Sequence, residues 1–126
     1  MFRLNFTTRV MGEDGAERVR RQEVFETLRS ERSDIARAFS NGTLTAGDEI
    51  EVALDGEIIG KASLSVIDRT DWDGITLIDA RESGFTSMPG LSAALRRAGY
   101  HVSPIDHYLF YRVQFDWREE GGQEYA

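Results

Sequence analysis

The stretch LIDARESGFTSMPGLSAALRRAGY, residues 77–100, decides the fold class of this 126-residue chain. It predicts one short helical turn that ends at Gly84 and a second short helix that ends at Gly99, because glycine is favoured just after a helix. Pro89 suits the first turn of the second helix, where a missing N–H leaves no bond unmade. The flanking segments alternate polar and apolar residues, so two short helices are expected between strands.

Two segments, one near each end of the chain, each predict a single strand. Residues 2–9, FRLNFTTR, place Phe2, Leu4 and Phe6 on one side of a strand. Residues 107–117, HYLFYRVQFDW, alternate in the same way and predict a long closing strand. The residues expected on one face of that strand are Leu109, Tyr111, Val113, Phe115 and Trp117.

The segment DEIEVALDGEIIGKASLSVIDR, residues 48–69, predicts a hairpin that turns at Asp55–Gly56. A two-residue turn would pair the wrong alternate set of side chains. A three-residue loop with a bulge at Gly56 instead sets Val52 opposite Ile58 and brings both apolar sets to one face. We therefore expect the bulge at Gly56.

Between the first strand and the hairpin, the apolar residues recur near helical spacing. Ser33 can cap a second helical piece that Asn41–Gly42 ends, so one helix or two short helices are expected, with a break near Ser33. Residues 11–17, MGEDGAE, are expected to form a turn-rich loop. The residues that carry the helical period are Val24, Leu28, Ile35 and Phe39.

The order of these elements favours an α+β fold, a small and partly open β-barrel with short helices packed on one side. Such a barrel hides most of the edges of a few strands. At this length the chain forms one domain, expected over residues 1–118. Residues 119–126 are expected to be an acidic, disordered tail.

Composition excludes several classes of site. The chain has no cysteine, which removes disulfides, thiolate nucleophiles and cysteine-bound zinc. Its two histidines, His101 and His107, do not have the spacing of a metal motif, so no metal and no cofactor are expected. No apolar run is long enough to span a bilayer and no signal peptide is evident, so we expect a cytoplasmic protein without a membrane partner.

The charge distribution is uneven. The net charge of −7 argues against a general nucleic-acid coat protein. Residues 17–37, however, carry six arginines and five acidic residues. Arginine is suited to bidentate contacts with phosphate or carboxylate, although a GC-rich genome also enriches it.

The elements TAGDEIEV, LIDARESGF, a short helix that ends in paired arginines, and the strand YRVQF come in an order that resembles the ASCH domain, a branch of the PUA-like barrels. The resemblance covers about residues 23–117. It implies an incomplete barrel in which a segment like residues 79–97 walls one side of a cleft. The family signature is G-x-K-x-x-E-x-R, and the stretch matched to it here is SERSDIAR, residues 30–37, in which only Arg37 is kept.

The resemblance also implies where chemistry would occur. Some members look like amidohydrolases that act on acetylated cytidine with a lysine, a threonine and a glutamate in the cleft. The positions matched to these are Arg32, Ile35 and Ser83, with Glu82 adjacent to the last. An arginine cannot lose its proton to act as a base, so whether the chain is an enzyme stays open, with Glu82 and Ser83 as the catalytic candidates.

The leading hypothesis is a domain that binds RNA or a nucleotide in an arginine-rimmed cleft. Arg37 is expected to be mostly buried and paired with a carboxylate when no ligand is bound. The alternatives are a small hydrolase, either an amidohydrolase on a modified nucleoside or a ribonuclease, and a non-catalytic protein-interaction module with an acidic face. The residues expected at the cleft are Arg29, Arg32, Arg37 and Arg112, with Tyr111 among the aromatic residues that can stack on a base.

Overall fold

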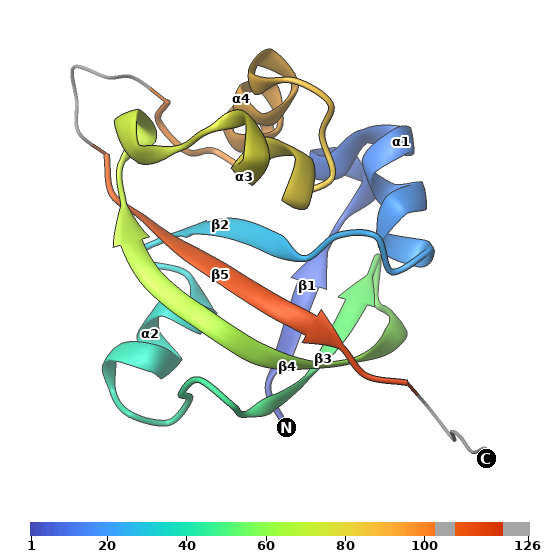
Figure 1. Ribbon diagram of the computed structural model, residues 1–126, viewed down its shortest axis with the longest axis vertical. Coiled ribbons are helices and arrows are strands. Elements are labelled where there is room, and N and C mark those ends of the chain that lie inside the picture. The colour runs from blue at the N-terminus through green and yellow to red at the C-terminus, as the bar shows by residue number, and fades with distance from the viewer. Residues whose placement is uncertain (103–107, 120–126) are drawn as a thin grey trace.

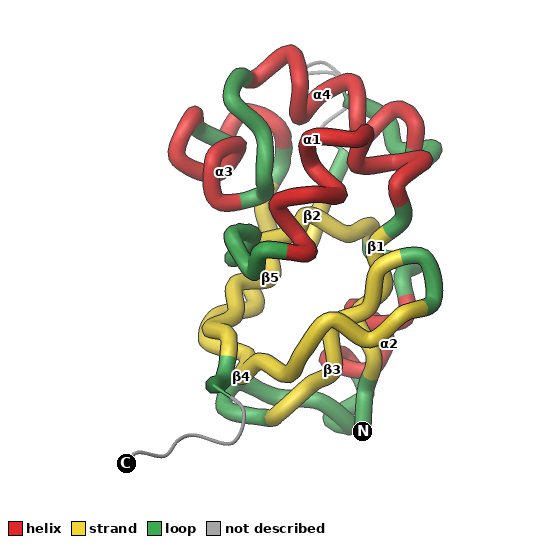
Figure 2. The backbone as a smooth tube through the Cα atoms, turned by 90° about the vertical axis from the view of Figure 1, so that its right-hand side faces the viewer, coloured by secondary structure: helices red, strands yellow, loops and turns green. Residues whose placement is uncertain are grey.

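The strands that the structure describes form one sheet in the order β1-β3-β4-β5-β2, which leaves β1 and β2 at its two edges. The computed structural model describes residues 1–102 and 108–119. β1 runs parallel to β3, and the other neighbours are antiparallel. The sheet curls into a partly open barrel, which confirms the expected α+β fold (Figures 1 and 2). The strands are β1 (Arg3–Phe6), β2 (Glu26–Ser30), β3 (Glu49–Leu54), β4 (Glu57–Thr70) and β5 (Phe110–Trp117).

Most of the helices gather on one side of this barrel. α1, α3 and α4 lie together at the top of Figure 1, whereas α2 lies toward the opposite end. None of the helices in the described ranges is long and apolar enough to cross a membrane. His107 and residues 120–126 of the expected tail lie outside the described residues. The helices are α1 (Thr8–Arg20), α2 (Asp34–Ser40), α3 (Leu77–Glu82) and α4 (Met88–Arg97), with a 3-10 turn at Trp72–Gly74.

The expected loop at residues 11–17 is wrong, because this segment belongs to α1. The side chain of Thr7 caps the helix by accepting from the N–H of Val10 at 3.3 Å. Gly12 breaks the helix with a φ of 78°, and the chain then resumes its helical path. Gly15 is buried in contact distance of Met11, so this glycine allows close packing rather than a turn.

The expected helix over residues 24–30 is also wrong, because β2 occupies residues 26–30. β2 pairs with β5 from Glu26 opposite Gln114 to Ser30 opposite Phe110. Nearly all of its residues are buried, because the barrel interior covers one face and the helices cover the other. A strand that is covered on both faces does not alternate, so its apolar spacing is uninformative. The break at Ser33 is confirmed, since its side chain caps α2 by accepting from the N–H of Ala36.

The hairpin contains a bulge, but not at Gly56. Asp55 and Gly56 form a two-residue turn with φ values of 50° and 86°, which is the sign pattern of a type I′ turn. The register shifts beyond the turn, where Val52 lies opposite Gly60 and Ala53 lies opposite Ile58. The predicted pairing of Val52 with Ile58 is therefore wrong. The displaced bulge lets Val52 face the core and leaves Ile58 exposed.

The stretch at residues 77–100 folds as its sequence predicts. Gly84 and Gly99 follow α3 and α4 with φ values of 97° and 89°, in the left-handed region that favours glycine. The apolar side of α4 packs on the sheet through Leu91, Ala94 and Leu95. β5 separates two apolar clusters, with Tyr111, Val113 and Phe115 in the barrel interior and Phe110 beneath α3 and α4. α3 and α4 therefore cover the outer face of the sheet at β5.

Candidate functional site

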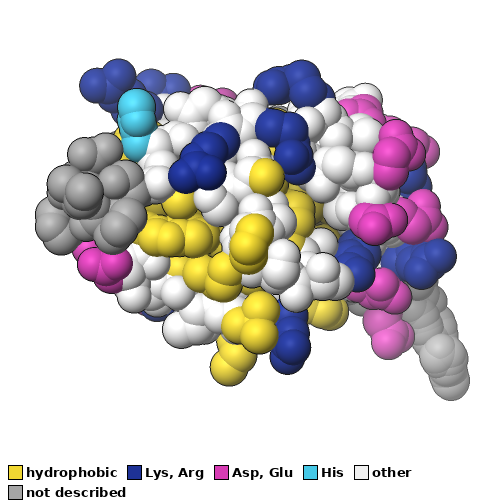
Figure 3. Space-filling view, turned by 90° about the horizontal axis from the view of Figure 1, so that it is seen from above, with side chains coloured by type: hydrophobic (Ala, Val, Ile, Leu, Met, Phe, Trp, Pro, Cys, Tyr) yellow, Lys and Arg dark blue, Asp and Glu magenta, His cyan; other side chains and the backbone are white. Residues whose placement is uncertain are grey.

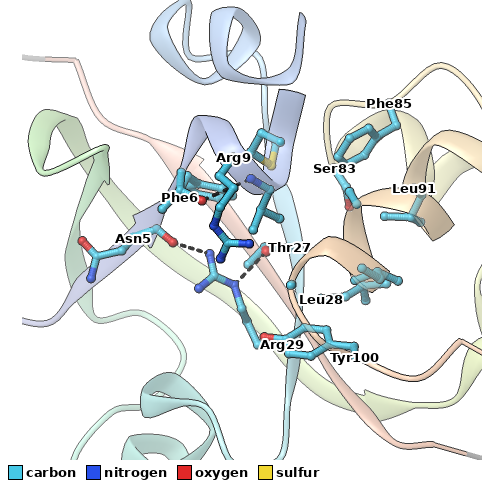
Figure 4. Close-up of a pocket in the computed structure, with 16 residues that line it drawn as sticks. Asn5, Phe6, Arg9, Thr27, Leu28, Arg29, Ser83, Phe85, Leu91 and Tyr100 are labelled. Atoms are coloured by element: carbon cyan, nitrogen blue, oxygen red, sulfur yellow. Dashed lines mark hydrogen bonds between the residues drawn. The ribbon is translucent and has the colours of Figure 1, made fainter. Parts of the chain in front are cut away.

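A cavity of about 230 Å³ opens where the two edge strands of the barrel approach each other. No backbone pairing joins β1 to β2 among the described strands. The side chain of Arg29, on β2, bridges this gap by donating to the carbonyl of Asn5, on β1, at 2.7 Å. A second bond from Arg29 to the hydroxyl of Thr27, at 3.0 Å, fixes its stem (Figure 4). The remaining wall comes from α1, α4, Ser83, Phe85 and Tyr100.

Two guanidinium groups converge on one side of this cavity. Arg9, from α1, and Arg29 extend toward the same point in Figure 4. Arg9 donates to the carbonyl of Arg97 at 3.0 Å, and Arg29 lies 5.1 Å from the centre of the Phe6 ring. Neither arginine forms an ion pair with any carboxylate of the described residues.

Burial lowers the pKa of the Arg29 guanidinium, but an arginine remains a cation at neutral pH. Among the described residues, Arg29 contacts uncharged oxygen atoms and the Phe6 ring, so no carboxylate of the described structure neutralises its charge. A partly buried cation without a carboxylate partner attracts an anion. The convergence of Arg9 and Arg29 therefore places two cations at this edge of the cavity.

The hydroxyl of Ser83 also belongs to the cavity. Ser83 follows α3 and is buried, and its hydroxyl oxygen has no hydrogen-bond partner among the described residues. A buried hydroxyl without a partner is unfavourable, so a ligand atom can improve its environment. Glu82, the neighbouring candidate, is exposed and does not line the cavity. The structure therefore separates the two catalytic candidates, with Ser83 inside the cavity and Glu82 outside it.

Of the four arginines expected at one cleft, only Arg29 lines the cavity. Arg32 is exposed and lies with His101 and Tyr108 at another part of the surface. Arg112 forms two hydrogen bonds with Asp68, at 3.0 and 2.9 Å, so its charge is neutralised.

The predicted burial of Arg37 is wrong, since its side chain is 66% exposed. It pairs with Asp34 of the same helix at 2.9 Å. Ile35 and Ala36 occupy the buried side of α2, which turns Arg37 to the solvent. An exposed pair of this kind contributes little to stability.

Tyr111 lies in the barrel interior rather than at the cavity. Its ring contacts Phe39 edge-on with 6.1 Å between the ring centres. Its hydroxyl is 3.2 Å from the hydroxyl of Ser40. Tyr100, which follows α4, is the tyrosine that lines the cavity. No local pattern in the sequence predicts the position of Tyr100, because it depends on the end of α4 lying beside the edge strands.

A buried polar cluster lies beneath α3, outside the cavity. Asp79 accepts hydrogen bonds from the N–H of Thr76 at 2.8 Å and from Arg112 at 3.4 Å. The bonds to Asp68 raise the pKa of Arg112, and so do the nearby negative charges. Glu26 completes the cluster and accepts from the side chain of Gln114 at 3.0 Å. Among the described residues, no histidine, cysteine or acidic side chains are grouped so that they could hold a metal ion.

Comparisons with solved structures identify the fold. An ASCH domain from Lactobacillus crispatus JV V101 superimposes with a TM-score of 0.59 and 16% sequence identity, over 81% of this chain and 69% of that one. A DUF984 protein from Enterococcus faecalis V583 superimposes with a TM-score of 0.62 and 15% identity, over 100% of this chain and 85% of that one. No protein-family model and no curated protein sequence matches the chain. The chain therefore has the fold of an ASCH domain.

Proposed function

We propose that this domain binds a nucleotide, either free or at an end of single-stranded RNA, in the cavity between β1 and β2. The observation that carries the proposal is the convergence of Arg9 and Arg29, two cations without a carboxylate partner in the described structure, on a cavity with apolar walls. Arginine forks bind phosphate oxygens well. The phosphate would therefore lie at the arginines and the base against the apolar wall.

The size and lining of the cavity favour a ligand of this kind. Its volume of about 230 Å³ is smaller than the roughly 300–1,000 Å³ typical of sites for drug-sized ligands. It therefore suits one nucleotide unit rather than a folded RNA. Phe85 and Tyr100 offer aromatic rings, and Leu91 and Leu95 offer apolar surface, for contact with a base.

The backbone at the open edge adds polar groups to the same site. The carbonyl of Phe2 accepts from Glu51 of β3, and the carbonyl of Phe6 accepts from Asp55 just beyond β3. In this parallel pairing the alternate residues Arg3 and Asn5 therefore turn their backbone groups away from β3, toward the gap. The carbonyl of Asn5 accepts from Arg29 for this reason. Unpaired edge groups can form hydrogen bonds with the polar rim of a base.

The net charge of −7 also shapes the expected binding. A negatively charged protein repels a polyanion at long range, so affinity depends on the local arginines. Added salt screens the contact between the arginines and the phosphate. We therefore expect binding that weakens with salt and that depends on a single arginine cluster.

Replacing Arg29 with glutamine is expected to weaken nucleotide binding by about tenfold to thirtyfold, because a charged hydrogen bond to phosphate is lost. Arg37→Gln is the matched control, since Arg37 is exposed on α2 and should leave binding unchanged. Calorimetric titration with the four ribonucleoside monophosphates and with short single-stranded RNA, at low and high salt, measures both effects. Absence of binding at low salt, or equal binding by both variants, contradicts the proposed site.

Catalysis is a second candidate function, favoured by the hydroxyl of Ser83 inside the cavity, which has no hydrogen-bond partner in the described part of the chain. Under this proposal the domain hydrolyses an acetylated cytidine or RNA, with Ser83 in contact with the reacting group. Incubation of the wild-type protein and of Ser83→Ala with both substrates tests it by product analysis. Turnover in the wild type that Ser83→Ala abolishes supports catalysis, and no turnover leaves the binding function alone.

A further inference from the structure

The carboxyl group of Glu26 is buried in the contact between β2 and α3. One of its oxygens accepts a hydrogen bond from Gln114 at 3.0 Å. The other oxygen, Oε2, is fully enclosed and no hydrogen-bond donor among the described residues reaches it. Enclosing a carboxylate oxygen without a donor is costly, so the ionised form of Glu26 is disfavoured here.

Asp79 of α3 is the neighbour that can satisfy this oxygen. Asp79 lies close enough to Glu26 that each carboxyl shifts the pKa of the other. Ionised carboxylates only accept hydrogen bonds, so a bond between these two groups requires a proton on one of them. Donors from Thr76 and Arg112 already converge on Asp79, which stabilises its ionised form. The proton therefore resides on Glu26.

The charges around the pair favour the same assignment. Burial raises the pKa of Glu26 to about 8, although the bond from Gln114 opposes the rise. Burial would also raise the pKa of Asp79, but its bonds from Thr76 and Glu26 and the charge of Arg112 lower it. The charged groups that face the pair are Arg112 from β5 and, through its two bonds to Arg112, Asp68 from β4. Opposite shifts in a pair of carboxyls identify one as the acid.

We propose that Glu26 is a positioning residue, which holds α3 against the sheet through its proton and releases α3 when that proton is lost. Ionised Glu26 and ionised Asp79 would repel each other in a buried site. Ser83 and Phe85, which directly follow α3, line the cavity, so release of α3 alters the cavity wall. Only this last link, from α3 to ligand binding, rests on the proposed function.

The direction of the pH effect follows from the raised pKa. Between pH 4.5 and about 8, Glu26 is protonated in the folded chain and ionised in the unfolded chain. Its contribution to stability is therefore complete below pH 4.5 and is lost as the pH rises toward 8. In this window the contribution of Glu26 to the folding equilibrium constant falls about tenfold for each pH unit.

Glu26→Gln tests the proposal because glutamine imitates the protonated carboxyl. It can accept from Gln114 and donate to Asp79 without titrating. Denaturant unfolding from pH 5 to 9 should show the loss of stability in the wild type and a flatter profile in Glu26→Gln. Glu31→Gln, at an exposed acid just after β2, should keep the wild-type profile. Identical profiles for the wild type and Glu26→Gln would overturn the proposal.

A direct titration of the wild type covers the case in which Glu26→Gln does not fold. The carbon-13 chemical shift of the Glu26 carboxyl should change with a midpoint near pH 8, and a midpoint near 4.5 overturns the proposal. Hydrogen exchange at Ala80, Ser83 and Phe85 reports the release of α3, since their N–H groups bond within or beside this helix. Above pH 8 these sites should exchange faster in the wild type than in Glu26→Gln, and equal rates overturn the release.

Titration with a ribonucleoside monophosphate at pH 6.5 and pH 9 tests the link to the cavity. Affinity should fall by about tenfold at the higher pH in the wild type and stay level in Glu26→Gln. Equal falls in both proteins overturn the link. If the nucleotide binds at neither pH, the proposed function fails, while the unfolding and exchange measurements still decide the role of Glu26.

Discussion

Replacing Gly84 with alanine is expected to lower the free energy of unfolding by about 3 kcal/mol. Gly84 has a φ of 97°, and a left-handed backbone costs other residues about 1–2 kcal/mol. An added Cβ atom would lie 2.9 Å from a methyl carbon of Val24 and 3.4 Å from the methyl of Met11. Overpacking of this kind adds roughly 1–3 kcal/mol. Denaturant unfolding measures the loss.

Gly99→Ala provides the matched control for this prediction. Gly99 follows α4 as Gly84 follows α3, and its φ of 89° is similar. No atom of the described residues lies within 4 Å of the Cβ atom that alanine would add there. The Gly99 variant should therefore lose only the backbone contribution, about 1–2 kcal/mol. Equal losses at both positions would show that the contact of Gly84 with Val24 is unimportant.

Replacing Arg112 with methionine is expected to lower the free energy of unfolding by about 3 kcal/mol at pH 7, because Asp79 is left as a buried charge without its cation. The side chains of Arg112 and Asp79 are 23% and 8% exposed. Asp68, the other partner, is 44% exposed and can turn to water, so we expect little of the loss to come from it.

The cost of Arg112→Met should decrease in acid. Arg112 is one of the groups that lower the pKa of Asp79, so its contribution is present above the ordinary value of 3.8 and is lost as the pH falls through the folded pKa. Unfolding at pH 7 and pH 3 measures this change. Arg69→Met, which breaks an exposed pair between β4 and Glu31, just after β2, should cost about 0–1 kcal/mol. A loss for Arg112→Met as small as that of Arg69→Met would contradict the buried-charge argument.

The neighbouring strands β5 and β2 show why the sequence predicts some elements and not others. β5 alternates because Tyr111, Val113 and Phe115 face the barrel interior while its other face carries Arg112 and Gln114. β2 lacks this alternation, because its residues are buried on both faces. The spacing of the apolar residues Val24 and Leu28 therefore predicts a helix where the structure has a strand.

The site depended on the same error. Arg29 is expected at a cleft and does line the cavity, whereas Arg32 and Arg37, expected beside it, do not. In the structure, β2 ends at Ser30 and α2 begins at Asp34, so the chain turns between them. The sequence does not single out Arg9, because residues 2–9 predict a strand, whereas α1 begins at Thr8. The two glycines of α1 look like turn residues in the sequence. Only the structure shows that Gly15 packs closely against Met11.

The sequence by itself determined the elements that depend on local interactions. The stops at Gly84 and Gly99, the cap at Ser33 and the turn at Asp55–Gly56 all depend on backbone preferences within a few residues. The α+β barrel followed from the order of these elements. Only the tertiary structure decided which arginines share a cavity, which carboxyls are buried beside each other and where the hairpin bulges. Each of these depends on contacts between residues far apart in the chain, such as Asn5 with Arg29 and Glu26 with Asp79, whose burial and charge arise only when the sheet edges and helices come together.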